Sequence, residues 1–257
     1  MTDKKSYKST SFISFAVIIL IWFTATKVFS VNKVFLPSPG NVAEALKRLL
    51  KDGMLLRYTW MSTKRVFIGW LISVIAALPL GMLTATSRFF KALLQPVMEF
   101  LRYRPVVALV PLTLLYFGIG ESQKYAIIFL GTFFQLILMV SDSVASVDRN
   151  MINAAATLGA AKKQQYFRVL LPAALPSLLD DMRLTIGWAW TYLVVAEMVA
   201  ADAGLGYMIL KNQRYLATDV IFAGLIMIGL VGLVTDFVFR LISYLAVPWA
   251  RRLNDNV

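Results

Sequence analysis

One polar segment interrupts the long apolar runs of this chain: Asn153-Ala-Ala-Ala-Thr-Leu-Gly-Ala-Ala-Lys-Lys-Gln-Gln-Tyr-Phe-Arg-Val-Leu-Leu-Pro-Ala-Ala-Leu-Pro176. Its small residues predict a short helix, and Gly159 followed by Ala160 predicts the turn after that helix. Pro172 and Pro176 are predicted to break the stretch that follows. Because apolar runs flank the segment on both sides, we expect it at a membrane face, where another protein could bind it. An ordinary amphipathic connector is the alternative interpretation.

The composition is that of a membrane protein. Of the 257 residues, 59% are hydrophobic and the mean hydropathy is +0.70, whereas roughly 45–50% apolar residues are usual in soluble domains. The sequence therefore predicts an all-α, polytopic membrane helical bundle. The net charge of +12 would suggest nucleic acid as a partner of a soluble protein. Here Lys and Arg flank apolar runs instead of sharing one face, so we expect no nucleic acid and contact with a lipid bilayer.

About six transmembrane helices are predicted, since a span needs roughly 20 mainly apolar residues. The candidate spans are residues 12–30, 65–86, 97–118, 124–142, 184–201 and 220–247. Three lysines precede the first span without a small-residue cleavage site, so residues 1–11 are predicted to be a cytoplasmic tail before a retained helix. An even number of spans then returns the C-terminus to the cytoplasm, which places both termini there.

The distribution of positive charge supports this orientation in part. Segments predicted to be cytoplasmic hold 15 of the 26 Lys and Arg residues, including Arg102 and Arg104 at the entrance of the third span. This excess agrees with the tendency of cytoplasmic loops to be rich in Lys and Arg. The outer segment from Lys27 to Arg65 holds eight more, and these argue against the assignment.

Residues 31–64 are predicted to form a rigid outer turn and a short helix. The turn is Phe35-Leu36-Pro37-Ser38-Pro39-Gly40-Asn41, and Asn41 is predicted to cap the helix. Apolar residues follow at helical spacing, at Val42, Ala45, Leu46, Leu49 and Leu50. This helix is expected either to lie along the membrane interface or to cover the ends of neighbouring spans.

Missing residue types exclude several kinds of chemistry. The chain has no Cys and no His, which removes disulfides, the commonest zinc ligand, and Ser-His-Asp or Cys-His catalysis. It also lacks a Gly-x-x-x-x-Gly-Lys-Ser/Thr phosphate loop. We therefore expect no catalytic residue, metal or cofactor in this chain. If transport is driven by ATP, a separate subunit must bind ATP and Mg²⁺.

Glu197 is the most unusual residue within a predicted span. A carboxylate at bilayer depth is costly, so it must face the bundle interior or water. It is a candidate for the translocation pathway or gate, together with Trp188, Trp190 and Tyr192 on the same helix. A helix–helix hydrogen bond of structural value is the alternative for Glu197. The three aromatic side chains could equally pack against neighbouring helices.

Residues 153–176 resemble the cytoplasmic EAA loop of ABC-transporter permeases. That loop has the pattern Glu-Ala-Ala, a Gly six residues after the Glu, and a later Pro-x-x-x-Pro. The residues that fall on the pattern are Ala154, Ala155, Gly159, Ala160, Pro172 and Pro176. Asn153 stands in place of the Glu, a departure that removes any contact made by its charge. Phe167 belongs to an apolar face that could anchor the loop or fill a groove in a partner.

Other stretches resemble the nitrate, sulfonate and taurine branch of the binding-protein-dependent importers. They are residues 36–39 after the first span, 104–111 and 116–121 around the third, and 195–198 with 204–207 around the fifth. The resemblance implies a MetI-like ABC permease fold in a single transmembrane domain over residues 1–257. It also implies that residues 143–182 are a cytoplasmic coupling loop.

The resemblance further implies a set of partners in a bacterial inner membrane. These are a second permease copy forming a homodimer, two ABC ATPase subunits that receive the loop as a coupling helix, and a solute-binding protein at the outer face. The solute would be a small anion such as a sulfonate, taurine or nitrate. The alternative is a self-sufficient, proton-coupled secondary transporter that uses Glu197 and Asp236. It predicts an internal inverted repeat, which the sequence does not show.

Overall fold

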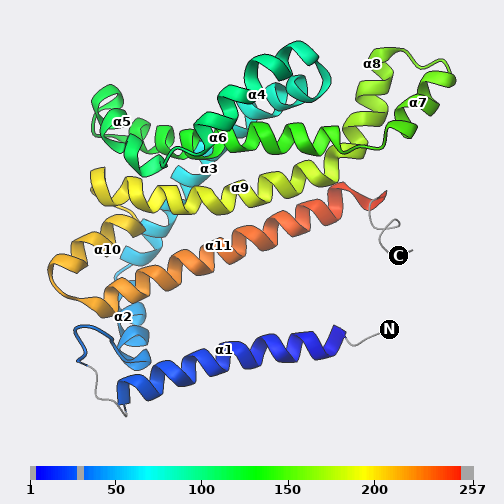
Figure 1. Cartoon of the computed structure of the whole chain (residues 1–257). Coiled ribbons are helices and arrows are strands. Elements are labelled where there is room, and N and C mark those ends of the chain that lie inside the picture. The colour runs from blue at the N-terminus through cyan, green and yellow to red at the C-terminus, as the bar shows by residue number, and fades with distance from the viewer. Residues whose placement is uncertain (1–3, 28–31, 250–257) are drawn as a thin grey trace. The chain divides into compact units, whose positions relative to one another are not determined.

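The computed structural model of the chain describes residues 4–27 and 32–249, apart from the side chains of residues 4–15 and 200. Every regular element in these residues is helical, as the sequence predicts (Figure 1). In chain order the elements are α1 (Lys4–Lys27), α2 (Pro39–Lys51), α3 (Met54–Thr86), α4 (Arg88–Arg102), the 3₁₀ turn η1 (Val106–Leu109), α5 (Val110–Phe117), α6 (Glu121–Ala145), α7 (Arg149–Thr157), α8 (Lys162–Gln164), the π-helix η2 (Gln165–Leu170), α9 (Leu171–Ala200), α10 (Leu205–Arg214) and α11 (Thr218–Ala246).

Three of the described helices, α3, α6 and α11, are long and apolar enough to cross a membrane on their own. They overlap the predicted spans 65–86, 124–142 and 220–247, although α3 begins well before residue 65. The predicted span 184–201 lies in the second half of α9. Residues 4–11 of the predicted tail are already part of α1. Residues 1–3 of that tail, and the last three residues of the first predicted span, lie outside the described residues.

The prediction of one continuous helix over residues 97–118 is wrong. α4 ends at Arg102, and the helical stretch Val106–Phe117 leaves it at an angle of 95°, so the two form a broken span or a re-entrant loop. Pro105 explains the break, because it has no N–H to donate and its ring would clash with the preceding turn. Arg102 and Arg104 therefore lie at this break and not at the entrance of a span.

The prediction that Pro172 and Pro176 break the helix before the fifth span is also wrong. Pro172 occupies the first turn of α9, where a missing N–H leaves no hydrogen bond unmade. Pro176 lies inside α9, and the helix continues through it to Ala200. The predicted coupling loop 143–182 includes the end of α6, which continues to Ala145, and the beginning of α9 at Leu171, and its role stays a prediction.

The chain divides into two compact units, of which the first comprises residues 1–61 and 202–229. Its core joins side chains of α2, α10 and the beginnings of α3 and α11. The buried members are Val42, Ala45, Leu49, Leu55, Leu205, Met208, Val220 and Ala223. Ser38 caps α2 by accepting a hydrogen bond from Asn41 N at 3.2 Å, so the prediction of Asn41 as the cap is wrong. The apolar face of α2 is buried in the protein, which supports the covering role over the interfacial one.

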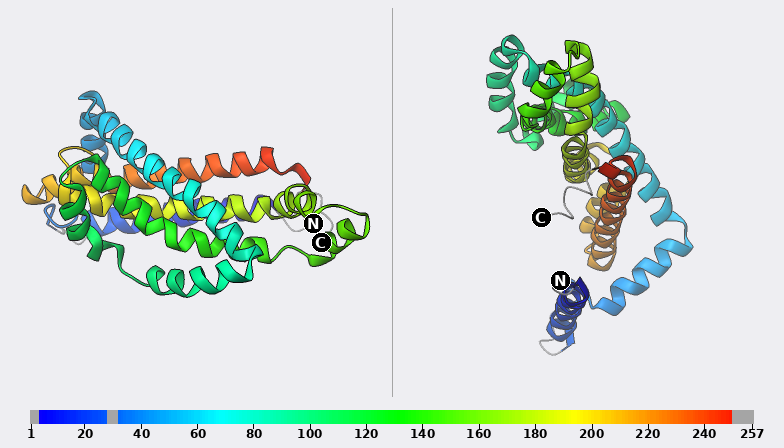
Figure 2. Two further views of the ribbon diagram at one scale, coloured as in Figure 1. Left: turned by 90° about the horizontal axis from the view of Figure 1, so that it is seen from above. Right: turned by 90° about the vertical axis from the view of Figure 1, so that its right-hand side faces the viewer.

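The second unit comprises residues 62–201 and 230–257, and α6 and α9 lie side by side at its centre (Figures 1 and 2). Leu136, Ile137 and Val140 of α6 share one buried cluster with Ala189 and Leu193 of α9. Close packing of these side chains stabilises the pair of helices. The prediction of one domain over residues 1–257 stays a prediction.

Candidate functional site

The segment after α6 folds as a short helix, a tight turn and a second helical stretch. At the end of α7 the N–H of Ala160 donates to the C=O of Ala155, and the N–H of Gly159 to the C=O of Ala156, both at 3.0 Å. This is the Schellman arrangement, in which the residue after the helix takes a left-handed backbone. Gly159 has φ of +80°, which suits a residue without a Cβ. The sequence predicts this turn, and the structure has it at the same residues.

This segment presents apolar side chains on its surface. Leu158 is 88% exposed and Phe167 is 55% exposed, and no residue of α7 is buried. Asn153 and Ala154 are exposed as well, whereas Ala155, Ala160, Pro172 and Pro176 are half-buried. Tyr166 and Leu170 instead pack against the core of the second unit, so that burial raises the pKa of Tyr166. The segment is thus anchored on one side and open on the other.

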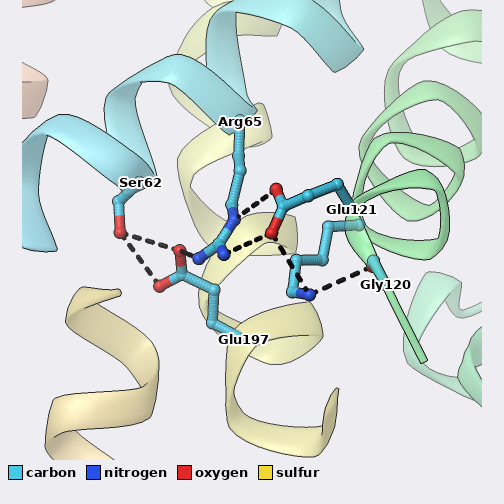
Figure 3. Close-up of polar contacts among 6 residues, drawn as sticks. Ser62, Arg65, Gly120, Glu121 and Glu197 are labelled. Carbon is cyan, nitrogen blue, oxygen red and sulfur yellow. Dashed lines mark hydrogen bonds and ion pairs between the residues drawn. The ribbon is translucent and has the colours of Figure 1, made fainter. Parts of the chain in front are cut away.

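Glu197 is buried and belongs to an ionic cluster that joins α3, α6 and α9, in which the side chain of Glu121 is 47% exposed (Figure 3). Oε1 of Glu197 accepts a hydrogen bond from Nη1 of Arg65 at 2.8 Å and one from the Ser62 hydroxyl at 2.8 Å. Arg65 also donates from Nε and Nη2 to the two carboxylate oxygens of Glu121, at 2.8 and 2.5 Å. The guanidinium therefore bridges two carboxylates from different helices, which is the planar fork geometry that Arg provides.

The cluster balances its charge within the protein. Lys124 completes it, with Nζ 3.6 Å from Glu121 and donating to the Gly120 carbonyl at 3.0 Å. Two cationic and two anionic side chains are thus combined, and Arg65 and Glu197 are 1% and 0% exposed. A buried charge is tolerated when it is paired and hydrogen-bonded in this way. The sequence assigned Arg65 to an outer positive segment, and no local pattern reveals its partners, which lie far away along the chain.

A cavity of about 480 Å³ opens beside the break between α4 and η1. The lining residues come from that break, from α6 and from α9, and they are Leu101, Arg102, Arg104, Pro105, Val106, Leu130, Gly131, Phe134, Gln135, Trp188 and Tyr192. Of the predicted pathway residues, Trp188 and Tyr192 line this cavity. Trp190 is buried in the main core cluster, and Glu197 is not part of the lining. Within the described residues, no group of three acidic side chains gathers as a metal site would require.

Comparison with known proteins identifies the family. The family model described as "Binding-protein-dependent transport system inner membrane component" matches residues 77–252. The chain belongs to this family. The match includes the exposed loop, the broken span and α9, whereas Ser62 and Arg65 of the ionic cluster lie before it.

Named relatives of this permease component include ABC transporter permeases. A probable ABC transporter permease of Brucella abortus is 36% identical over 93% of this chain and 95% of its own length. The taurine transport permease TauC of Escherichia coli is 32% identical over 91% and 87%. A Bacillus subtilis protein named as an aliphatic sulfonates transport permease, SsuC, is 35% identical over 91% and 85%. A nitrate import permease of Synechocystis is also similar. The predicted membership of this branch is confirmed.

Solved structures support the fold of this permease component. A chain of the inward-facing MetNI methionine ABC transporter matches it with a TM-score of 0.67 at 23% identity, over 77% of this chain and 97% of that one. The predicted all-α MetI-like permease fold is therefore confirmed. Members of the family are components of membrane transport systems rather than enzymes. As a member, this chain is the permease component of an ABC importer.

Proposed function

We propose that this permease component is the transmembrane subunit of an ATP-driven importer whose ATPase subunits bind the exposed segment from α7 to η2. The observation that carries this proposal is a helix with no buried residue, closed by a Schellman turn, beside exposed Leu158 and Phe167. Exposed apolar side chains on a rigid element are suited to a partner's groove. Asn153 meets that partner as a neutral hydrogen-bonding group in place of a carboxylate.

The orientation that follows places this segment and both termini in the cytoplasm of a bacterial inner membrane. Support comes from a cavity of about 460 Å³ beside the segment, whose lining includes Lys91, Arg149 and Lys162. Cationic residues gather on the cytoplasmic side of membrane proteins. The complex then contains two copies of this chain as a homodimer, two ATPase subunits that hold ATP and Mg²⁺, and a solute-binding protein at the outer face.

The solute in this proposal is a small anion, either a sulfonate such as taurine or an oxyanion such as nitrate. The names of the relatives support that class, and so do the two arginines in the cavity lining. Trp188 and Tyr192 are assigned to the pathway because their side chains line the same cavity. For Glu197, the bonds to Arg65 and Ser62 support the structural interpretation over the gate.

The decisive experiment compares the same substitution at two glycines that have a similar backbone conformation and similar free space around the Cβ position. Gly159 and Gly53 each follow a helix, with φ of +80° and +66°, and a Cβ at either would meet nothing within 4 Å. Gly159→Glu is expected to abolish ATP-dependent uptake and to prevent co-purification of the ATPase. Gly53→Glu adds the same backbone strain and the same charge outside the loop, and should retain the ATPase.

Two outcomes would overturn the proposal. One is a Gly159→Glu complex that still co-purifies with the ATPase and transports normally, which would make the segment an ordinary connector. The other is uptake into liposomes by the isolated chain without ATP, driven by a proton gradient. That result would establish the self-sufficient secondary transporter, for which no contact of Glu197 or Asp236 provides a specific argument.

A further inference from the structure

The break between α4 and η1 carries charged side chains to the middle of a membrane span. The cavity residues contributed by α6 run from Leu130 to Gln135, close to the centre of the 25-residue helix Glu121–Ala145. At 1.5 Å per residue, α6 is about 37 Å long, slightly more than the hydrocarbon core of about 30 Å. The cavity therefore faces the middle of this span, and Arg102 and Arg104 line it at that depth.

These two arginines have no acidic partner in the part of the chain that the structure describes. Neither forms a salt bridge there, and the cavity lining contains two arginines and no carboxylate. Charged side chains within a span are costly and mark substrate or ion pathways. The ionic cluster around Arg65 shows how this chain balances a buried arginine that has a structural role. Arg102 is exposed and Arg104 is half-buried, and the described residues provide neither of them with a balancing anion.

Both guanidinium groups contact aromatic rings, and most of their N–H donors have no partner among the residues that the structure describes. The guanidinium carbon of Arg104 lies 5.4 Å from the centre of the Phe134 ring. That of Arg102 lies 4.8 Å from the Tyr103 ring, and its Nη2 donates to the Tyr103 hydroxyl at 2.9 Å. Each guanidinium has five N–H donors, so these contacts orient the groups without satisfying them. Two forks with free donors are suited to the oxygens of a planar or tetrahedral oxyanion.

The rest of the lining fits a small organic anion better than a bare inorganic ion. Trp188, Phe134 and Tyr192 provide apolar walls, and Gln135 provides an amide. The volume of about 480 Å³ lies in the usual range of small-molecule sites, roughly 300–1,000 Å³. Such a cavity can hold a charged head against the arginines and a short carbon chain against the rings.

We infer that this cavity is the binding subsite for the sulfonate group of the transported solute, with Arg102 and Arg104 as its counter-charges. The inference rests on the proposed function and names the place where the anion pauses during transport. Trp188 and Tyr192 bound the carbon chain of the solute. All the lining residues of the cavity belong to the second unit of the chain.

The test uses the purified complex of this chain with its ATPase, in nanodiscs of phosphatidylcholine. The probe is ethanesulfonate, and the readout is the tryptophan fluorescence of Trp188, with Trp188→Phe to identify the signal. Wild-type complex should show a saturable change with ethanesulfonate and none with choline. Arg104→Gln or Arg102→Gln should each weaken binding about tenfold or more, because a charged hydrogen bond is lost. Arg104→Lys should give an intermediate loss, since Lys keeps the charge but not the fork.

Arg240→Gln is the matched control, because this arginine lies in the same unit but pairs with Asp236 and is absent from the cavity lining. It should bind ethanesulfonate as the wild type does. Unchanged ethanesulfonate affinity in both cavity variants would overturn the inference. A fluorescence change that appears only with phosphatidylglycerol nanodiscs, with no response to ethanesulfonate, would assign the cavity to a lipid phosphate and overturn it too.

Different experimental results would reject the proposed function and the sulfonate subsite. Normal ATPase co-purification with unchanged ethanesulfonate affinity in the Arg variants would reject the subsite alone. Loss of the ATPase association from the wild-type chain would reject the importer model, while ethanesulfonate binding could still be measured on the permease component.

Discussion

Arg65 on α3 and Glu197 on α9 form a buried ion pair with an N–O distance of 2.8 Å. The same guanidinium binds Glu121 at the start of α6, so three helices meet at one side chain. In a low-dielectric interior, the free energy of such a pair depends on both partners being present. Removing one carboxylate leaves a buried positive charge with half of its compensation.

We therefore predict that Glu197→Gln lowers the free energy of unfolding by about 3 kcal/mol, the usual cost of breaking a buried pair. A lower Tm of the detergent-solubilised protein is the expected observation. Glu99→Gln is the control, since Glu99 is exposed and, within the described residues, its carboxylate accepts a hydrogen bond from Gln95 alone. An unchanged Tm together with abolished uptake would contradict this prediction and restore the gate interpretation of Glu197.

This ion pair also shows which features a sequence can predict. The partners of Arg65 are 56 and 132 residues away, and only the packing of α3 against α6 and α9 brings them together. Hydropathy placed Arg65 at the border of an outer segment because it measures each residue with its chain neighbours. The turn at Gly159 could be predicted, since a left-handed residue after a helix depends on a few adjacent residues.

The broken span shows the same limit in a second form. Pro105 is a local signal against a continuous helix, but an average over residues 97–118 is apolar enough to hide it. Once α4 ends at Arg102, the positions of Arg102 and Arg104 along the span change. The cavity that they line therefore could not be predicted from the sequence and is seen only in the three-dimensional structure.

A second prediction concerns Gly131, which lies on α6 against the ring of Tyr192. A Cβ at Gly131 would collide with that ring, so Gly131→Ala should push Tyr192 toward the cavity. We expect a destabilisation of about 1–3 kcal/mol, as for overpacking in a core, and slower uptake. Gly187→Ala is the matched control, since a Cβ there meets nothing within 4 Å.

A double substitution separates crowding from other effects of Gly131→Ala. In the Tyr192→Leu background, which lacks the ring, adding Gly131→Ala should lower the Tm much less than it does in the wild type. The reason is that the two changes affect one contact. Additive losses of Tm in the two variants would show that the collision does not occur.

The exposed segment gives a third prediction. Leu158→Ser removes an apolar side chain that is 88% exposed, so the free energy of unfolding should change by less than about 0.5 kcal/mol. If the ATPase covers this residue, its affinity should fall by about tenfold, the effect of losing one well-packed side chain. Ile119→Ser is the control, as Ile119 is 87% exposed in the turn before α6, at the other end of that helix from the segment. Equal ATPase affinities for both variants would exclude Leu158 from the interface.

The last prediction concerns Asp236. A substitution at this residue distinguishes a structural carboxylate from a proton carrier. Asp236 forms an ion pair with Arg183 of α9 and another with Arg240 at 2.8 Å, and its side chain is 35% exposed. Arg240 lies one helical turn after Asp236 on α11, and Arg183 is a second cation contributed by α9. Partly exposed pairs stabilise a protein by about 0–1 kcal/mol. Asp236→Asn should therefore lower the Tm slightly and leave ATP-driven uptake and its pH dependence as in the wild type.

The opposite result has a clear physical meaning. A carrier that moves protons needs a carboxylate that is released from its cations during the cycle, and Asn cannot bind and release a proton. If Asp236→Asn abolished uptake while the ATPase remained bound and active, a titrating role for Asp236 would follow. Because the carboxylate of Asp236 is held by two guanidinium groups in the structure, we expect uptake to survive the substitution.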